Sequence, residues 1–171
     1  MDGWERAVLA LRLLVSHPCS LGGAVIRMRA GPARDRLRNW LQTHLKTRAI
    51  APSVTDEQLF GGLDLGVALS QGRVVHAAGI LQPDTTMILT MAERCDEALA
   101  AKLAQALDQK ACQTVVALDE GVEPDEACPL ALAERCAFHI CPEGRMPDDW
   151  LDDTTEARYS NIISNEINAI P

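Results

Sequence analysis

Aromatic residues are scarce in this sequence: three Trp, two Phe and one Tyr make up 4% of its 171 residues. No basic stretch interleaves them in the manner that lets a protein stack on bases, so we expect no nucleic-acid-binding surface. No apolar run approaches the roughly 20 residues that span a bilayer. The first residues also lack the basic region and apolar core of a signal peptide. We therefore expect a cytoplasmic protein without a membrane span.

Closely spaced cysteine pairs are missing as well. The six cysteines are scattered, and none forms the paired spacing that zinc ribbons use. The nearest approach to a ligand set is Cys136 with His139 and Cys141, and alternation within one short apolar strand explains this cluster more simply. We expect reduced, mostly buried thiols and no metal site.

Charge is distributed unevenly along the chain, whose net charge is −8. Residues 1–50 carry nine Lys and Arg against three Asp and Glu, whereas residues 119–171 carry three against thirteen. Two explanations stay open: a solvated surface, or a head-to-tail interface in which the basic face of one subunit meets the acidic face of the next. The length and the 47% hydrophobic content indicate one ordinary core.

Hydrophobic periodicity predicts helices that alternate with strands. The predicted helices cover 4–15, 32–46, 93–107 and 129–135, and the predicted strands cover 24–28, 86–91, 113–118 and 137–141. This alternation predicts an α/β fold with a mostly parallel sheet and right-handed crossovers. The composition changes from Pro142 onward. We assign residues 1–145 to one α/β domain and 146–171 to an acidic linker, or to the start of a C-terminal extension in a truncated chain.

Between the second and third of these helices the sequence predicts two short ones. Thr55 and Gln58 have capping-box spacing, which marks a helix start. Gly61 and Gly62 break that helix, and Asp64 caps another that runs to about residue 71.

The segment after the first predicted strand has the frame of a phosphate-binding loop. Such a loop needs glycines for close approach of the backbone, a Lys for the phosphate charge, and a Ser or Thr hydroxyl for Mg²⁺. Here Gly31 remains, Arg34 stands at the Lys position, and Asp35 takes the hydroxyl position. An acid there repels phosphate.

Two further parts of an ATPase site are absent from the sequence. The strand at 86–90 leads into Met91 and Ala92 instead of an acidic pair, and we expect Glu93 to point elsewhere. The next strand ends in Asp119 and Glu120, where a neutral polar side chain is expected near the γ-phosphate. The sequence therefore predicts a domain that does not hydrolyse ATP, with residual nucleotide binding through Gly31 and Arg34 as the alternative.

Arginines gather around the same loop. Arg27 and Arg29 alternate onto one face of the first strand, and Arg34, Arg36 and Arg38 follow in the next helix. Arginines are costly inside a covered sheet, so we expect them to emerge at the nucleotide edge and to meet carboxylates instead of phosphates. Our hypothesis is that this edge serves as a protein contact.

Several segments together resemble the N-terminal AAA+ domain of the D subunit of magnesium chelatase. The resemblance covers roughly residues 4–141. It rests on segments in the same order along the chain, namely 4–7, 21–25, 30–36, 55–65, 79–81, 91–94, 116–121 and 132–139. It implies a P-loop-type, three-layer αβα domain. The relatives usually insert a hairpin before the third predicted strand, but here only residues 108–113 intervene, so contacts of that hairpin are not carried over.

The resemblance also implies a function. In this family the I subunit hydrolyses ATP, the D subunit forms a platform with it in hexameric rings, and the H subunit binds protoporphyrin IX for Mg²⁺ insertion. ATP and Mg²⁺ then act at the level of the complex, and this domain binds no cofactor of its own. Arg135, in a Glu134–Arg135 pair where the relative has Asp–Arg, is at the position of an arginine that reaches the neighbouring subunit's nucleotide. The rival readings are a nucleotide-binding switch with Arg34 replacing Lys, or an unrelated small α/β enzyme.

Overall fold

The computed structural model describes residues 3–63, 69–70, 72–74, 76–123, 125–143, 147–148 and 150–151. A five-stranded sheet forms the centre of this part of the chain, in the order β2-β5-β6-β1-β7, and every pairing in it is parallel. Its strands are β1 (Gly23–Arg27), β2 (Thr47–Ile50), β5 (Thr86–Leu89), β6 (Thr114–Asp119) and β7 (Phe138–Ile140). The predicted α/β fold with a mostly parallel sheet is confirmed.

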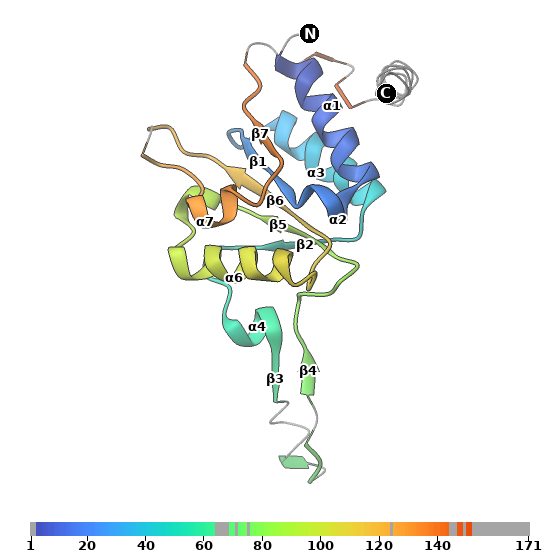
Figure 1. Cartoon of the computed structure of the whole chain (residues 1–171), viewed down its shortest axis with the longest axis vertical. Coiled ribbons are helices and arrows are strands. Elements are labelled where there is room, and N and C mark those ends of the chain that lie inside the picture. The colour runs from blue at the N-terminus through green and yellow to red at the C-terminus, as the bar shows by residue number, and fades with distance from the viewer. Residues whose placement is uncertain are drawn as a thin grey trace, which may run out of the picture.

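Helices cover both faces of this sheet (Figure 1). The helical elements are α1 (Gly3–Ser16), α2 (Pro18–Leu21), α3 (Pro32–His44), α4 (Asp56–Phe60), η1 (Ala92–Arg94), α6 (Glu97–Asp108) and α7 (Leu130–Ala133). Helices α1 and α3 pack on one face, and α6 and α7 pack on the other. The three-layer αβα arrangement is therefore confirmed.

Strand β6 shows why the two cores form. All six of its residues are buried, and successive side chains point to opposite faces. Val115 and Ala117 join the cluster under α6, whereas Val116 and Leu118 join the cluster under α1 and α3. A continuous apolar run at the sheet centre thus supplies both cores at once.

Helix starts follow local capping chemistry. The capping box predicted at Thr55 and Gln58 is present and begins α4. The helix predicted from 93 instead begins at Glu97, because the Asp96 carboxylate accepts a hydrogen bond from the Leu99 N–H at 2.7 Å. The preceding residues form the short 3-10 turn η1 after Met91, whose φ of 51° is left-handed.

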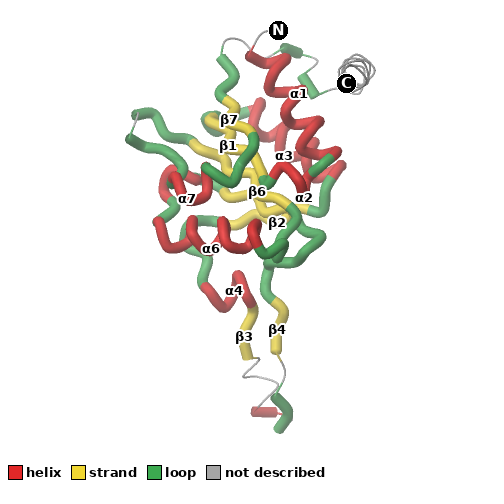
Figure 2. The backbone as a smooth tube through the Cα atoms, in the orientation of Figure 1, coloured by secondary structure: helices red, strands yellow, loops and turns green. Residues whose placement is uncertain are grey.

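Three strands were not predicted. Strand β2 is an edge strand, and β3 (Gly61–Leu63) pairs antiparallel with β4 (His76–Ala78). Gly61 therefore begins a strand as well as ending α4; its φ is 88°, and a Cβ there would lie 2.3 Å from the Ala77 carbonyl oxygen. Most of the helix predicted from Asp64 lies outside the described residues. Figure 2 shows the β3–β4 pair projecting away from the main sheet; we call residues 56–63 and 76–78 the arm.

The C-terminal part of the described chain returns to the core. Trp150 and Leu151 are buried beside α1, and the Trp150 ring packs edge-on against Trp4 with centroids 4.8 Å apart. Packing thus continues past the predicted boundary at 145, into the segment 146–171 that was predicted to be a linker or an extension. Residues 152–171 of that segment lie outside the described residues. None of the described helices has both the length and the apolarity of a membrane span.

Candidate functional site

The carboxyl ends of β1, β5 and β6 meet at one edge of the sheet, where ligands bind in open α/β folds. The predicted phosphate loop follows β1 here. Gly31 has a φ of 155°, which L side chains rarely adopt, and a Cβ there would meet nothing within 4 Å. Glycine is therefore favoured at position 31 by the backbone conformation, since a side chain would have enough space there. Asp35 lies exposed in the first turn of α3.

Arg34 binds a carboxylate of its own chain. Its guanidinium forms a hydrogen-bonded ion pair with Glu120, which follows β6 and is 86 positions away in sequence. The two side chains are only 16% and 27% exposed, so water screens this pair less than a surface pair. The expectation that these arginines meet carboxylates is confirmed for Arg34. Arg36 instead donates to the Asp148 carbonyl oxygen at 2.7 Å, and Arg29 is exposed.

Glu93 joins the same network. Its carboxylate accepts a hydrogen bond from the Glu120 backbone N–H at 2.9 Å, and the side chain is 8% exposed. The prediction that Glu93 points away from this edge is wrong, because the turn η1 after Met91 directs it back toward the loop after β6. The loops after β1, β6 and β5 are therefore connected through Arg34, Glu120 and Glu93.

Arg27, the last residue of β1, holds the loop that carries Glu120. Its guanidinium donates to the carbonyl oxygens of Gly121 at 3.1 Å, of Glu123 at 3.0 Å and of Glu126, and lies 3.7 Å from the Asp119 carboxylate. Arg27 thus binds mainly backbone carbonyl oxygens, and the Asp119 carboxylate is a more distant partner.

Two acidic side chains anchor the same loop, and neither of these anchoring roles was predicted. The buried Asp119 carboxylate accepts from the N–H groups of Gly121 at 2.8 Å and Cys128 at 3.0 Å. The N–H groups of Val122 and Glu123 hydrogen-bond to the Glu126 carboxylate and lower its pKa. Asp at 119 with Gly two residues later is an Asx-turn signal that predicts the first anchor.

Arg135 lies at the opposite, amino edge of the sheet. It follows α7 and precedes β7, and its carbonyl oxygen faces Gly22, the residue before β1. Its guanidinium lies 3.4 Å from the Asp108 carboxylate and 3.8 Å from that of Glu134. Arg34 comes after β1, so the structure does not bring the two predicted site residues together.

The buried cysteines are chemically quiet thiols. Burial raises the pKa of Cys128 and Cys136 to about 12, and the pKa of Cys95 and Cys112 to about 11. Few of these thiols ionise at neutral pH, so they are poor nucleophiles. The prediction of mostly buried thiols is confirmed, and Cys19 and Cys141 are the exposed ones.

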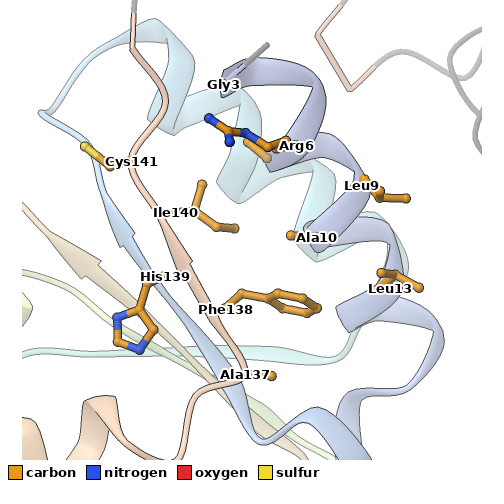
Figure 3. A pocket seen from close by; sticks show the side chains of 11 residues that line it. Gly3, Arg6, Leu9, Ala10, Leu13, Ala137, Phe138, His139, Ile140 and Cys141 are labelled. Carbon is orange, nitrogen blue, oxygen red and sulfur yellow. The ribbon is translucent and has the colours of Figure 1, made fainter. Parts of the chain in front are cut away.

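A cavity of about 560 Å³ lies between α1 and the edge strand β7. Figure 3 shows Phe138 and Ile140 pointing toward α1, whereas His139 points away from it. The lining is largely apolar, with Arg6 as its charged member on α1. Among the described residues that line it, the cavity therefore has no pair of side chains that could act as general acid and base.

Two curated proteins are similar to this chain in sequence. The chain is 44% identical over 142 residues to the magnesium-chelatase 60 kDa subunit of Cereibacter sphaeroides, and 42% identical over 140 residues to that of Rhodobacter capsulatus. These matches cover 82% and 80% of the chain. The chain is homologous to magnesium-chelatase 60 kDa subunits over this segment. It spans about a quarter (25%) of the length of these relatives. No family profile matches the chain.

Solved structures show the same fold. The chain superposes, with a TM-score of 0.62 and 14% identity, on one chain of a complex between subunits BchI and BchD of magnesium chelatase that was built on a cryo-EM reconstruction. The match covers 98% of this chain and 72% of the chain from that complex. A proposed ATPase from Cytophaga hutchinsonii gives a TM-score of 0.56 at 17% identity, covering 96% of this chain and 52% of that one. At these identities the likeness shows the fold alone: a parallel sheet covered by helices on both faces.

Proposed function

We propose that the chain is the AAA+ module of a D-type platform subunit of magnesium chelatase and does not itself hydrolyse ATP. It assembles with the ATP-hydrolysing I subunit in homo- and hetero-oligomeric rings. With the H subunit carrying protoporphyrin IX, the assembly inserts Mg²⁺ for chlorophyll or bacteriochlorophyll biosynthesis. The whole complex is the enzyme, an ATP-dependent ligase that inserts a metal ion, and ATP and Mg²⁺ act at the level of that complex. The homology to 60 kDa subunits supports this assignment.

The observation that carries the inactive role is the ion pair between Arg34 and Glu120. Phosphoryl transfer needs a cation directed at the phosphates and carboxylates directed at Mg²⁺ and the attacking water. Here the cation at the Lys position binds Glu120, and Glu93 accepts from the backbone of that same residue. A nucleotide would have to displace the Glu120 carboxylate from Arg34, and its phosphates would then meet the negative charge of Glu93 as well.

Arg135 is proposed as the residue that acts on a neighbour. It lies at the edge of the sheet opposite the phosphate loop, so it is badly placed for its own chain's loop and well placed for a subunit that packs head to tail. Its side chain is 40% exposed, and its acidic partners are more exposed still. Exposed ion pairs of this kind are weak and easily exchanged for a phosphate.

Association with the I subunit tests the assignment. The full chain, mixed with the I subunit of the same organism and ATP, is expected to co-elute as a larger assembly in size-exclusion chromatography with light scattering. The unmixed chain is expected to show no ATP turnover. Two results contradict the proposal: separate elution under all nucleotide conditions, or ATP turnover by this chain alone.

The Arg135→Ala variant tests the role in trans. We expect assembly to persist, and ATP hydrolysis at the sites that this chain completes to fall by about 10³-fold, because a guanidinium supplied in trans stabilises charge on the γ-phosphoryl group. Lys46→Ala, which removes another exposed ion pair, with Asp84, is the matched control and should leave the rate unchanged. Equal rates for the two variants would rule out the role.

A further inference from the structure

Glu120 connects the loops that follow β1, β5 and β6 at the carboxyl edge of the sheet. It follows β6 directly, its carboxylate pairs with Arg34 at the start of α3, and its N–H donates to Glu93 after β5. Both side chains of the ion pair are largely shielded from solvent. The contact is therefore a built feature of this edge and not an incidental surface pair.

The surroundings of Arg34 favour an anion. The guanidinium lies in the first turn of the 13-residue helix α3, where unpaired backbone N–H groups add positive potential. An external phosphate is one way to neutralise such a position. The chain supplies a carboxylate of its own instead, so the positive charge is already neutralised before any ligand arrives.

The loop around Glu120 holds its carboxylate in place. Arg27 binds three carbonyl oxygens between 121 and 126, and Asp119 and Glu126 accept from N–H groups of the same loop. Gly121 has no space for a side chain, since a Cβ there would lie 2.0 Å from the Glu126 carbonyl oxygen. A carboxylate on a pre-organised loop competes with free ligands at a high effective concentration.

We propose that Glu120 determines the specificity of this edge by excluding phosphate-bearing ligands from Arg34. Removal of its charge converts the edge into a binding site for phosphate and polyphosphate anions. The inference concerns anion binding by the chain itself, so it stands or falls separately from assembly with the I subunit.

The Glu120→Gln variant of the full chain provides the test, with inorganic tripolyphosphate and ATP as probes in isothermal titration calorimetry. The amide retains the shape of the side chain but not its charge. We expect the affinity for both anions to rise at least about tenfold over the original chain, which corresponds to roughly 1.4 kcal/mol. No gain in affinity overturns the proposal.

Two controls make the result specific. Glu123→Gln removes the same charge from the same loop at an exposed side chain and should give no gain. The double variant Arg34→Ala with Glu120→Gln should lose the gain. An equal gain in Glu123→Gln, or a gain that survives in the double variant, contradicts the proposal. If Glu120→Gln does not fold, Glu120→Ser is measured with the same expected outcomes.

Discussion

At the scale of single residues, two arginines of this chain bind its own loop after β6, at a place where an ATPase directs cations at a ligand. Arg34 pairs with a carboxylate, and Arg27 binds backbone carbonyls that no helix or strand satisfies. The sequence shows which residues stand at the nucleotide edge, because parallel strands deliver their carboxyl ends to one side. It does not show which of several acidic residues in 119–126 each arginine meets, since that depends on the folded loop.

Arg27 is expected to matter for stability. The Arg27→Ala variant loses three hydrogen bonds to carbonyl oxygens and leaves the buried Asp119 carboxylate without its nearby cation. Because the Arg27 side chain is 35% exposed, water compensates in part, and we expect the free energy of unfolding to fall by about 2 kcal/mol.

Urea denaturation measures this loss. Arg29→Ala, an exposed arginine on the following loop, is the control and should change stability by less than about 0.5 kcal/mol. If the two variants lose the same amount, the carbonyl contacts of Arg27 contribute nothing that is specific to them.

At the scale of elements, the sequence predicts those helices and strands whose formation depends on neighbouring residues. The capping box at Thr55 and the strand at 24–28 are readable because they need only neighbouring residues. Strand β2 has only four residues, of which Arg48 and Ala49 are exposed, so it shows no apolar alternation. The strands of the arm have three residues each, and contacts across the arm, not periodicity, hold them.

The arm exposes apolar side chains that the core does not use. Leu59 anchors α4 in the core, whereas Phe60 is 53% and Leu63 47% exposed. Exposed apolar groups that gather on a projecting element mark a contact surface. If the arm contacts the I subunit in the proposed assembly, Phe60→Ser should weaken that association at least about tenfold while stability changes by less than about 0.5 kcal/mol.

Analytical ultracentrifugation of the mixed proteins, with thermal unfolding of the single chain, separates the two effects. Val122→Ser, at another exposed apolar residue on the loop after β6, is the matched control and should leave association unchanged. Association of Phe60→Ser as tight as that of the original chain would exclude the arm from the interface.

At the scale of the whole molecule, the two predicted site residues belong to opposite ends of one sheet. The edge with Arg34 is closed by the chain's own carboxylates, and the edge with Arg135 presents an exposed guanidinium. In the proposed ring, each such subunit would have one edge without ATP hydrolysis and one edge with a guanidinium directed at a neighbour. Both residues can be singled out from the sequence, but their placement at opposite edges follows from the parallel pairing of β1 with β7, because Arg34 comes after one strand and Arg135 before the other.

The described chain also closes on itself through two tryptophans. Trp150 is 2% exposed and belongs to the core cluster under α1 and α3, so Trp150→Ala should lower the free energy of unfolding by about 3 kcal/mol through the cavity that it leaves. Leu130→Ala, at a side chain that is 67% exposed, should cost less than about 0.5 kcal/mol. Chemical denaturation of both variants checks this, and equal losses would show that the tryptophan pair does not stabilise the fold.

The contact between Trp4 and Trp150 has a consequence for how such a module is used in longer proteins. The polypeptide enters and leaves the folded body at nearly the same spot, beside the start of α1 and away from the arm (Figure 1). A domain whose two ends lie close together can be inserted into a longer protein as a unit. Further domains attached at that spot would be tethered beside the carboxyl edge of the sheet, which leaves the amino edge with Arg135 and the arm accessible to neighbouring subunits.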